Sequence, residues 1–244
     1  MNTSFEWLDQ IDRNILYFIN DTLANPIFDL FFTTMTNERL WAIPVLIGLL
    51  ALIVRGDRRG QIAAVLVLIA AGASDATVVQ IIKPAIGRLR PSHALGDTIN
   101  LLVPKGGRYG FVSAHAANIF AGTTVLSYFY GQWKKPLLFL AFSVALSRVY
   151  VGVHYPGDVF FGGLIGYGIA WVIITLWVFL KMRELKRGRT WVRYSKNLSG
   201  NIDQLGSVPS GGFTPKSVNP SCPGDLISPY LDSNFFILSV NAIK

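Results

Sequence analysis

The amino-acid sequence predicts an all-α fold, a polytopic bundle of about six membrane helices. Composition gives the first observation: hydrophobic residues make up 51% of the 244 residues, charged residues only 15%, and the mean hydropathy is +0.42. An ordinary soluble domain of this size is less apolar. The second observation is that apolar stretches near the length needed to cross hydrocarbon recur along the chain. Because these stretches do not alternate with period two, they favour helices over a membrane barrel.

Residues 1–37 are predicted to form an amphipathic or first membrane segment. The stretch "FEWLDQIDRNILYFIN" carries apolar residues at helical spacing among acids and amides, and a break is expected at Pro26. One spanning helix, and a surface helix followed by a short insert, both fit this pattern. No basic segment precedes a compact apolar core, so no cleavable signal peptide is expected.

Residues 38–182 are predicted to form a transmembrane core that also holds the catalytic site. Its apolar stretches are residues 40–54, 61–82, 116–130, 136–153 and 157–180. If these alternate across the membrane, the basic residues at 55–59, 134–135 and 181–196 share one side, which the positive-inside rule makes cytoplasmic. The loops at 83–113 and 154–157 then lie on the non-cytoplasmic side. The net charge of +8 is accounted for by basic residues that set the topology, contact anionic headgroups or belong to the site described below. No nucleic-acid partner is therefore expected.

The end of the chain differs in composition from the core. Residues 183–197 form a basic segment, predicted to be cytoplasmic. Residues 198–244 are rich in Gly, Ser, Pro and Asn, lack helical periodicity, and are predicted to be a disordered tail. The single cysteine, Cys222, lies in this tail, which excludes an internal disulfide.

Three stretches place charged side chains inside or beside apolar segments. They are "KPAIGRLRP" at residues 83–91, "FVSAHA" at 111–116 and "SRVYVGVHYPGD" at 147–158. Charged groups in such positions are costly without a partner or a function. All three stretches fall at the same predicted membrane face, which indicates one shared site.

The cations in these stretches suit a phosphate ligand. Lys83, Arg90 and Arg148 would repel one another in a small volume unless an anion lay between them. Arginine holds phosphoryl oxygens in two-point contacts, and lysine acts as a point charge. Ser113 is expected to cap the following helix, whose N-terminus adds backbone donors. The predicted phosphate-binding residues are therefore Lys83, Arg90, Ser113 and Arg148.

The histidines suit covalent phosphoryl transfer. His154 can attack phosphorus as a neutral imidazole if Asp158 accepts a hydrogen bond from its other ring nitrogen. His115 can protonate the leaving oxygen and later accept a proton from the attacking water. The predicted catalytic residues are His154, His115 and Asp158. Since the cations already neutralise charge in the transition state, no metal or other cofactor is expected.

The three stretches resemble the three-part signature of the type 2 phosphatidic acid phosphatase superfamily: Lys-x6-Arg-Pro, Pro-Ser-Gly-His and Ser-Arg-x5-His-x3-Asp. The first and third parts match at every defined position, with Pro91 and Ser147 completing them. The second part differs, because Val112 replaces proline and Ala114 replaces glycine. Alanine restricts backbone conformations that glycine tolerates, which bears on how closely this loop approaches a phosphate.

The resemblance implies a membrane-bound phosphatase with His154 as nucleophile and His115 as acid and base. Members of the bacterial membrane branch remove phosphate from lipid phosphates or diphosphates without a metal. Phosphatidic acid, phosphatidylglycerophosphate and undecaprenyl diphosphate all remain open as substrates. The implied partners are a lipid phosphate and the bilayer, and the implied location is a bacterial inner membrane with the site facing the periplasm. The sequence does not predict an oligomeric state.

Two alternatives belong to other functional classes. A vanadium-dependent haloperoxidase uses the same constellation to hold vanadate, but several membrane spans argue against it. A non-catalytic lipid-binding or transport protein could retain the pocket, but the complete set of nucleophile, orienting carboxylate and acid–base residue disfavours this reading.

Some polar residues outside the motifs have simpler interpretations. His93 is the one histidine outside them and is expected to be capped or solvated. Asp75, inside the 61–82 stretch, is expected to make an interhelical hydrogen bond rather than to relay protons. Glu38 and Arg39 are expected to form an interfacial pair or to touch a lipid headgroup.

Overall fold

The computed structural model describes residues 6–187, and within this range the chain forms helices joined by loops, with no strand beyond one isolated β-bridge between Leu89 and Tyr109. The predicted helical class is therefore confirmed. The predicted tail at residues 198–244, with Cys222, lies outside the described residues. The basic segment predicted at 183–197 is described only as far as residue 187.

The N-terminal segment is two helices rather than one. Helix α1 (Glu6–Tyr17) runs into a short π-helical segment, η1 (Phe18–Thr22), and α2 (Pro26–Thr36) follows. Asn25 caps α2, because its side chain accepts hydrogen bonds from the first backbone N–H groups of that helix. Pro26 occupies the first helical position, where its missing N–H costs nothing. The break predicted at Pro26 is confirmed.

A buried amide joins this segment to the rest of the fold. Asn20 is fully buried, and its Nδ2 donates to the carbonyl oxygens of Tyr150 (2.6 Å) and Asn100 (2.7 Å). Its Oδ1 accepts from the backbone N–H of Asn100 at 2.8 Å. The N-terminal segment is thus held against the loops at the end of the bundle.

Helix α3 (Glu38–Val54) follows α2 directly, with Asn37 as its cap. The axes of α2 and α3 are bent by 54° at this break. Helix α2 packs on α8, and α3 packs on α4. The remaining long helices form the centre of the fold: α4 (Arg58–Ala76), α7 (Ala114–Phe129), α8 (Lys134–Tyr150) and α9 (Pro156–Lys186).

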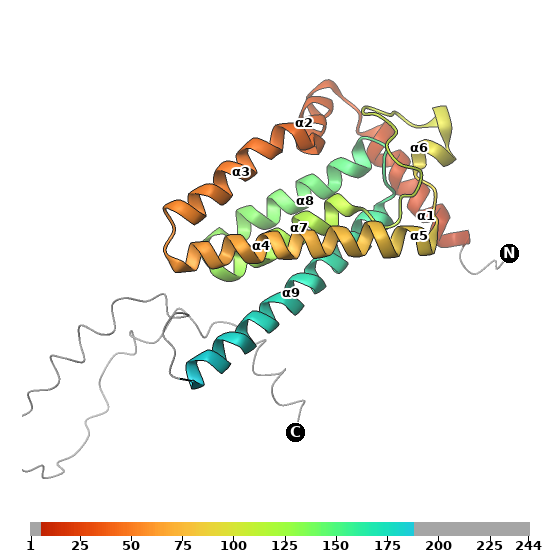
Figure 1. The fold of residues 1–244 in the computed structure, drawn as a ribbon. Helices are drawn as coiled ribbons and strands as arrows, with labels where there is room; N and C mark the ends of the chain where they lie inside the picture. Colours follow the sequence, from red (N-terminus) through yellow and green to blue (C-terminus); the bar gives the residue numbers. More distant parts are fainter. Residues whose placement is uncertain (1–5, 188–244) are drawn as a thin grey trace, which may run out of the picture. The chain divides into compact units, whose positions relative to one another are not determined.

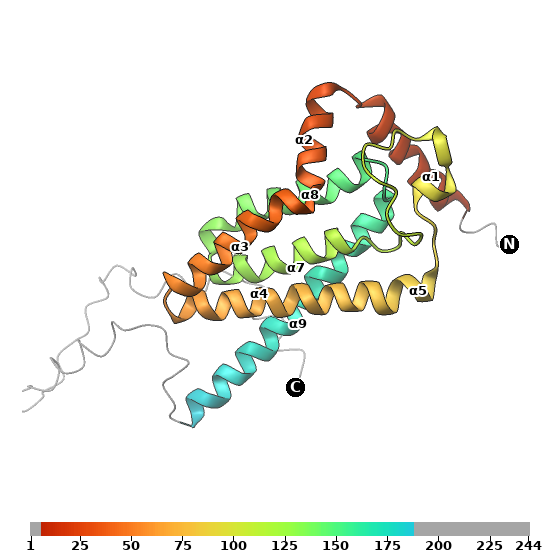
Figure 2. The same ribbon diagram turned by 45° about the horizontal axis from the view of Figure 1, so that its top comes forward.

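Helix α7 lies at the centre of this group. It packs against α4, α8 and α9, and Figures 1 and 2 show α4, α7 and α8 running alongside one another while α9 crosses them. Helix α4 continues through a π-helical segment, η2 (Thr77–Ile82), into the short α5 (Lys83–Ile86). Each of the apolar stretches predicted to be helical is a helix in the structure.

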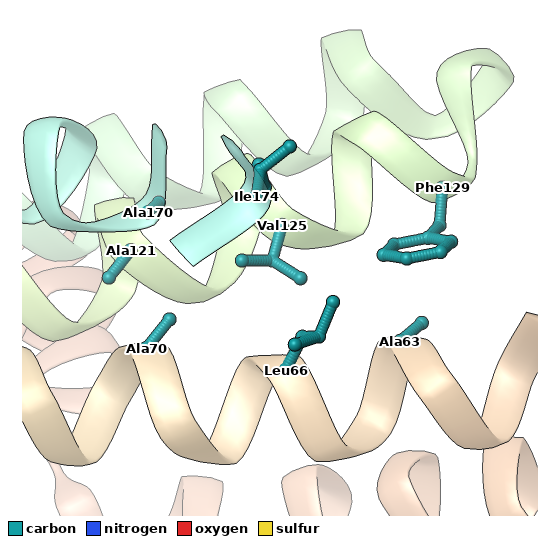
Figure 3. Close-up of a cluster of buried hydrophobic side chains, with 8 residues drawn as sticks. All are labelled: Ala63, Leu66, Ala70, Ala121, Val125, Phe129, Ala170 and Ile174. Atoms are coloured by element: carbon teal, nitrogen blue, oxygen red, sulfur yellow. The ribbon is translucent and has the colours of Figure 1, made fainter. Parts of the chain in front are cut away.

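Small residues allow these helices to approach closely. The core between α4, α7 and α9 contains alanines alternating with larger apolar side chains: Ala63, Leu66, Ala70, Ala121, Val125, Phe129, Ala170 and Ile174 (Figure 3). On α9, a Cβ added at Gly166 would lie only 2.0 Å from the carbonyl oxygen of Ala117 on α7. The two backbones are in direct contact there, which fixes the start of α9 beside the start of α7.

The helical lengths allow a membrane location. Two continuous helical stretches, Arg58–Ile86 and Pro156–Glu184, are long and apolar enough to cross a membrane, and the bent pair α2–α3 makes a third if it counts as one span. Helices α7 and α8 have 16 and 17 residues. The bundle of about six membrane helices remains a prediction, as does the side on which the site lies.

Candidate active site

The three stretches singled out in the sequence meet at one end of the bundle. His154 interacts electrostatically with Lys83, Arg90, Arg148 and His115, although these residues come from different parts of the chain. In both ribbon views α1, α5 and α6 (Pro91–Ala94) lie at the end of the bundle where α9 begins (Figures 1 and 2). The fold therefore brings the predicted site residues into one small volume.

The loop after α5 places Arg90 near Lys83. Gly87 ends α5 in the left-handed conformation, with φ of +65°, and its N–H donates to the carbonyl of Lys83. The chain then folds back, so that the Arg90 N–H donates to the Arg108 carbonyl at 3.1 Å and Arg90 Nε donates to the Tyr109 carbonyl at 3.2 Å. Burial lowers the pKa of Arg90, an effect that Asp158 opposes. The two hydrogen bonds to the Arg108 and Tyr109 carbonyls fix the direction of the Arg90 side chain.

Arg148 is held at the end of α8. It is buried, and its Nη1 donates to the hydroxyl of Thr36, the last residue of α2. Within residues 6–187 its Nε has no hydrogen-bond partner. A buried donor of this kind calls for an acceptor, and a phosphoryl oxygen would supply one.

Ser113 and His115 lie at the start of α7. Ser113 is fully buried; its Oγ accepts from the Ala116 N–H at 3.5 Å, and its own N–H donates to the carbonyl of Asp158 at 2.9 Å. His115 Nε2 lies 2.7 Å from Oε1 of Glu38 at the start of α3. Glu38 thus contacts a site histidine. The sequence had led us to expect only an interfacial pair with Arg39 or a headgroup contact.

Val112, which replaces the usual proline, has a packing role. It is fully buried in a cluster with Val78 of η2 and Ala117 of α7. The second motif therefore begins at a core position, and a branched apolar side chain fills it.

His154 lies in the turn between α8 and α9. Its backbone N–H donates to the Arg148 carbonyl at 3.1 Å, and its Nδ1 lies 3.5 Å from Oδ2 of Asp158. The same carboxyl oxygen accepts from the Tyr155 N–H at 3.1 Å. Burial, followed by the charges of Arg90 and Arg148, holds the pKa of His154 well below its usual value. The imidazole is therefore neutral at neutral pH, with Nδ1 toward the carboxylate.

Arg88 is a residue that the sequence reasoning missed. Its Nη1 donates to Oδ1 of Asp158 at 2.9 Å, and its Nη2 contacts Asp12 at 2.7 Å and Asp9 at 3.1 Å. Burial alone would lower the pKa of Arg88, but Asp158, Asp12 and Asp9 more than offset this and raise it. The spacing of Asp9 and Asp12, which puts both on one face of an amphipathic helix, is the signal that could have indicated a distant cation.

The remaining polar candidates lie apart from this cluster or have simple partners. Asn118 Nδ2 on α7 donates to Oδ1 of Asp75 on α4 at 3.1 Å, so the interhelical hydrogen bond predicted for Asp75 is confirmed. His93 is exposed, and its Nε2 lies 3.3 Å from the Gly106 carbonyl. In the part of the chain described, no group of three or more His, Cys, Asp or Glu side chains could hold a metal ion.

The low pKa of His154 predicts a pH-dependent stability. An unfolded histidine takes up a proton near pH 6.5, whereas folded His154 stays neutral to lower pH. Below pH 6.5 the unfolded state then binds more protons than the folded state. The free energy of unfolding therefore decreases as the pH is lowered, by up to about 1.4 kcal/mol per pH unit. We expect a steeper loss of thermal stability in detergent between about pH 7 and about pH 5 for the wild type than for His154→Asn. Parallel curves for the two proteins would contradict this expectation.

Gly110 packs directly against the site. A Cβ there would lie 3.0 Å from Oδ2 of Asp158 and 3.2 Å from Cγ of Arg90. We expect Gly110→Ala to lower phosphate release by about 10-fold or more, because small displacements of positioning groups are costly in catalysis. Gly107→Ala is the matched control in the same loop, since nothing lies within 4 Å of its added Cβ. Equal activity of the two variants would show that Asp158 and Arg90 tolerate the displacement.

The fold and the site together define the class: a helical membrane protein in which two histidines and three cations surround one small volume. The chain belongs to the PAP2 superfamily, whose family model matches residues 62–182. All three motifs fall inside this range. The family resemblance seen in the sequence is therefore confirmed.

Relatives with established names are lipid phosphatases. The lipid A 4'-phosphatase of Bacteroides thetaiotaomicron is 30% identical over 175 residues, which cover 68% of this chain and 77% of that protein. The undecaprenyl-diphosphatase of Sulfolobus acidocaldarius is 35% identical over 98 residues, covering 40% and 47% of the two chains.

Solved structures share the fold. The crystal structure of Aquifex aeolicus LpxE matches with a TM-score of 0.56 and 26% identity, covering 68% of this chain and 95% of that chain. A transmembrane PAP2-type phosphatidylglycerolphosphate phosphatase from Bacillus subtilis matches with a TM-score of 0.57 at 19% identity, covering 70% of this chain and 86% of that chain. At that identity the second likeness concerns the fold alone.

Proposed function

We propose that this membrane lipid phosphatase works through a phosphohistidine at His154 and requires no metal ion. The observation that carries the proposal is the position of His154, with Nδ1 3.5 Å from Asp158 and with Lys83, Arg90 and Arg148 around the ring. This arrangement leaves Nε2 as the nucleophilic nitrogen. It also supplies the positive charge that a transferring phosphoryl group needs.

The reaction has two steps. In the first, Nε2 of His154 attacks phosphorus, a P–N bond forms, the P–O bond to the lipid breaks, and His115 donates a proton to the leaving oxygen. In the second, water attacks phosphorus, His115 takes a proton from it, and the P–N bond breaks to release phosphate. Lys83, Arg90, Ser113 and Arg148 hold the phosphoryl oxygens in both steps.

Glu38 fits the first of these steps. Burial and the charge of Arg148 lower the pKa of His115 to about 4, and the Glu38 carboxylate, 2.7 Å from Nε2, opposes this shift. Glu38 therefore favours the protonated imidazole, which is the form that donates the proton. Glu38 is also exposed at the start of α3, so it can move away when a headgroup enters.

The substrate that we favour is a phosphate monoester on a glycolipid of the lipid A class. The support comes from relatives of that name, of which this chain matches most of the length. Undecaprenyl diphosphate is the second candidate, because an undecaprenyl-diphosphatase is similar over a shorter range. The assay also includes phosphatidic acid and phosphatidylglycerophosphate as the two remaining candidate substrates.

The proposed topology has about six membrane helices with the site on the non-cytoplasmic face of a bacterial inner membrane. The supporting observation is the position of the basic link between α3 and α4, at residues 55–59. In both ribbon views this link lies at the end of the bundle away from α1 and α5 (Figures 1 and 2). The positive-inside rule assigns that end to the cytoplasm.

The test is phosphate release from these four lipids by the full chain in detergent with a chelator present. We expect release to be fastest from the lipid A phosphate and to persist with the chelator. Fastest release from undecaprenyl diphosphate would select the second candidate. Bromide oxidation with added vanadate would favour a haloperoxidase, and lipid binding without any release would favour a non-catalytic protein.

A further inference from the structure

Helix α1 reaches the site through a chain of ion pairs. Asp12 Oδ2 lies 2.7 Å from Nη2 of Arg88, and Asp9 Oδ1 lies 3.1 Å from the same nitrogen. Nη1 of Arg88 lies 2.9 Å from Oδ1 of Asp158. These residues are separated by about 70 positions or more along the chain, so the folded structure alone brings them together.

The packing around Arg88 fixes its direction. The guanidinium lies over the ring of Tyr155, with Cζ 4.1 Å from the ring centroid. The second oxygen of Asp12 accepts from the backbone N–H of Gly157 at 2.7 Å. Asp12 therefore contacts both Arg88 and the first turn of α9, the turn that carries Asp158.

Asp158 depends on this arrangement. Its side chain is completely buried, and Arg88 is its arginine or lysine partner among the described residues. A buried carboxylate that loses its cation becomes costly, and it relieves the cost by taking up a proton or turning away. In either case it would no longer present a charged oxygen to Nδ1 of His154, which lies 3.5 Å away.

We propose that α1 is part of the catalytic apparatus, because Asp12 and Asp9 hold Arg88, and Arg88 holds Asp158 charged and in place behind His154. Arg88, Asp12 and Asp9 are positioning residues: they act through Asp158 and do not touch the phosphate. This inference rests on the proposed function of His154 as nucleophile. It adds a contribution from the N-terminal helix, which lies outside the three motifs.

The kinetic test separates positioning from binding. We expect Arg88→Met to lower kcat by about 10- to 100-fold, as loss of outer-shell partners commonly does, and Asp12→Asn to act in the same direction. KM and the affinity for vanadate should stay within about 3-fold of wild type, because the phosphate-binding cations are untouched. Arg88→Lys should recover part of kcat, because it keeps a cation beside Asp158. Gln10→Ala is the control on the same helix, since it removes an exposed hydrogen bond to Asn14 and leaves Asp9, Asp12 and Arg88 in place.

A double-mutant cycle decides whether Arg88 acts through Asp158. In the Asp158→Asn background, Arg88→Met should cause no further loss of kcat, since the carboxylate it positions is already neutral. An equal loss in both backgrounds would overturn the proposal. So would an Arg88→Met variant with wild-type kcat, or one whose vanadate affinity falls together with kcat.

A spectroscopic test needs no turnover. In protein labelled with ¹⁵N at its three histidines, the His154 resonances should report a proton on Nδ1 in wild type and in Gln10→Ala. In Arg88→Met they should report a mixture of tautomers, and an unchanged spectrum would refute the inference. Absence of phosphate release by the wild type would instead refute the proposed function, so the two failures are distinguishable. Thermal melting of each variant shows whether it has folded.

Discussion

Replacing His154 with asparagine is expected to reduce phosphate release by about 10⁴-fold or more while the protein still folds. The loss follows from removing the nitrogen that attacks phosphorus. The fold should persist because the turn is held by backbone hydrogen bonds, from the N–H groups of His154 and Val153 to the carbonyl of Arg148. The measurement is phosphate release from the lipid panel, together with acid-quenched labelling by ³²P-lipid to trap the phosphohistidine.

The matched control for this variant is His93→Asn. His93 is exposed and lies outside the site, so this variant should keep wild-type release and wild-type labelling. Vanadate binding should survive in His154→Asn, because Lys83, Arg90 and Arg148 remain. Turnover by His154→Asn at the wild-type rate would rule out the covalent mechanism.

Replacing Gly166 with valine is expected to cause the largest loss of stability. A Cβ at this position would lie 2.0 Å from the Ala117 carbonyl oxygen and 2.7 Å from the Ala117 carbonyl carbon, so the backbones of α7 and α9 must separate. Overpacking typically costs about 1–3 kcal/mol and occasionally more, and a contact with backbone places this variant at the upper end of that range. The measurement is the thermal unfolding midpoint in detergent.

Gly168→Val and Gly168→Ala provide the comparison, since nothing lies within 4 Å of a Cβ added at Gly168. Alanine there should raise stability slightly, because it favours helix over glycine. Gly166→Ala should fall between Gly166→Val and the wild type. Similar midpoints for Gly166→Val and Gly168→Val would show that α9 does not depend on close contact with α7.

Much of the fold could be predicted from local properties of the chain. Apolar stretches of about 15 to 24 residues must satisfy their backbone groups internally in a membrane, and this condition selects helices. The break at Pro26 could also be predicted, since proline is favoured at the first position of a helix, where its missing N–H costs nothing. The bend between α2 and α3 could not be predicted from the sequence, because it depends on how these helices pack on α8 and α4.

The motif residues could also be recognised from the sequence, because their chemistry and spacing are local. Lys83 and Arg90, or His154 and Asp158, lie within a few residues of each other, and a single loop or turn brings each pair together. The pairing of the Asp75 carboxylate with a neighbouring helix followed from the cost of leaving it unpaired in hydrocarbon.

By itself, the sequence determined the helical class and the family, and it predicted the residues that would carry phosphoryl transfer. Only the tertiary structure decided which distant groups support them: Glu38 beside His115, and Arg88 with Asp12 and Asp9 behind Asp158. The physical reason is that these ion pairs join segments far apart in the chain. Their geometry depends on the close approach of whole helices, which alanine and glycine permit at the centre of the bundle.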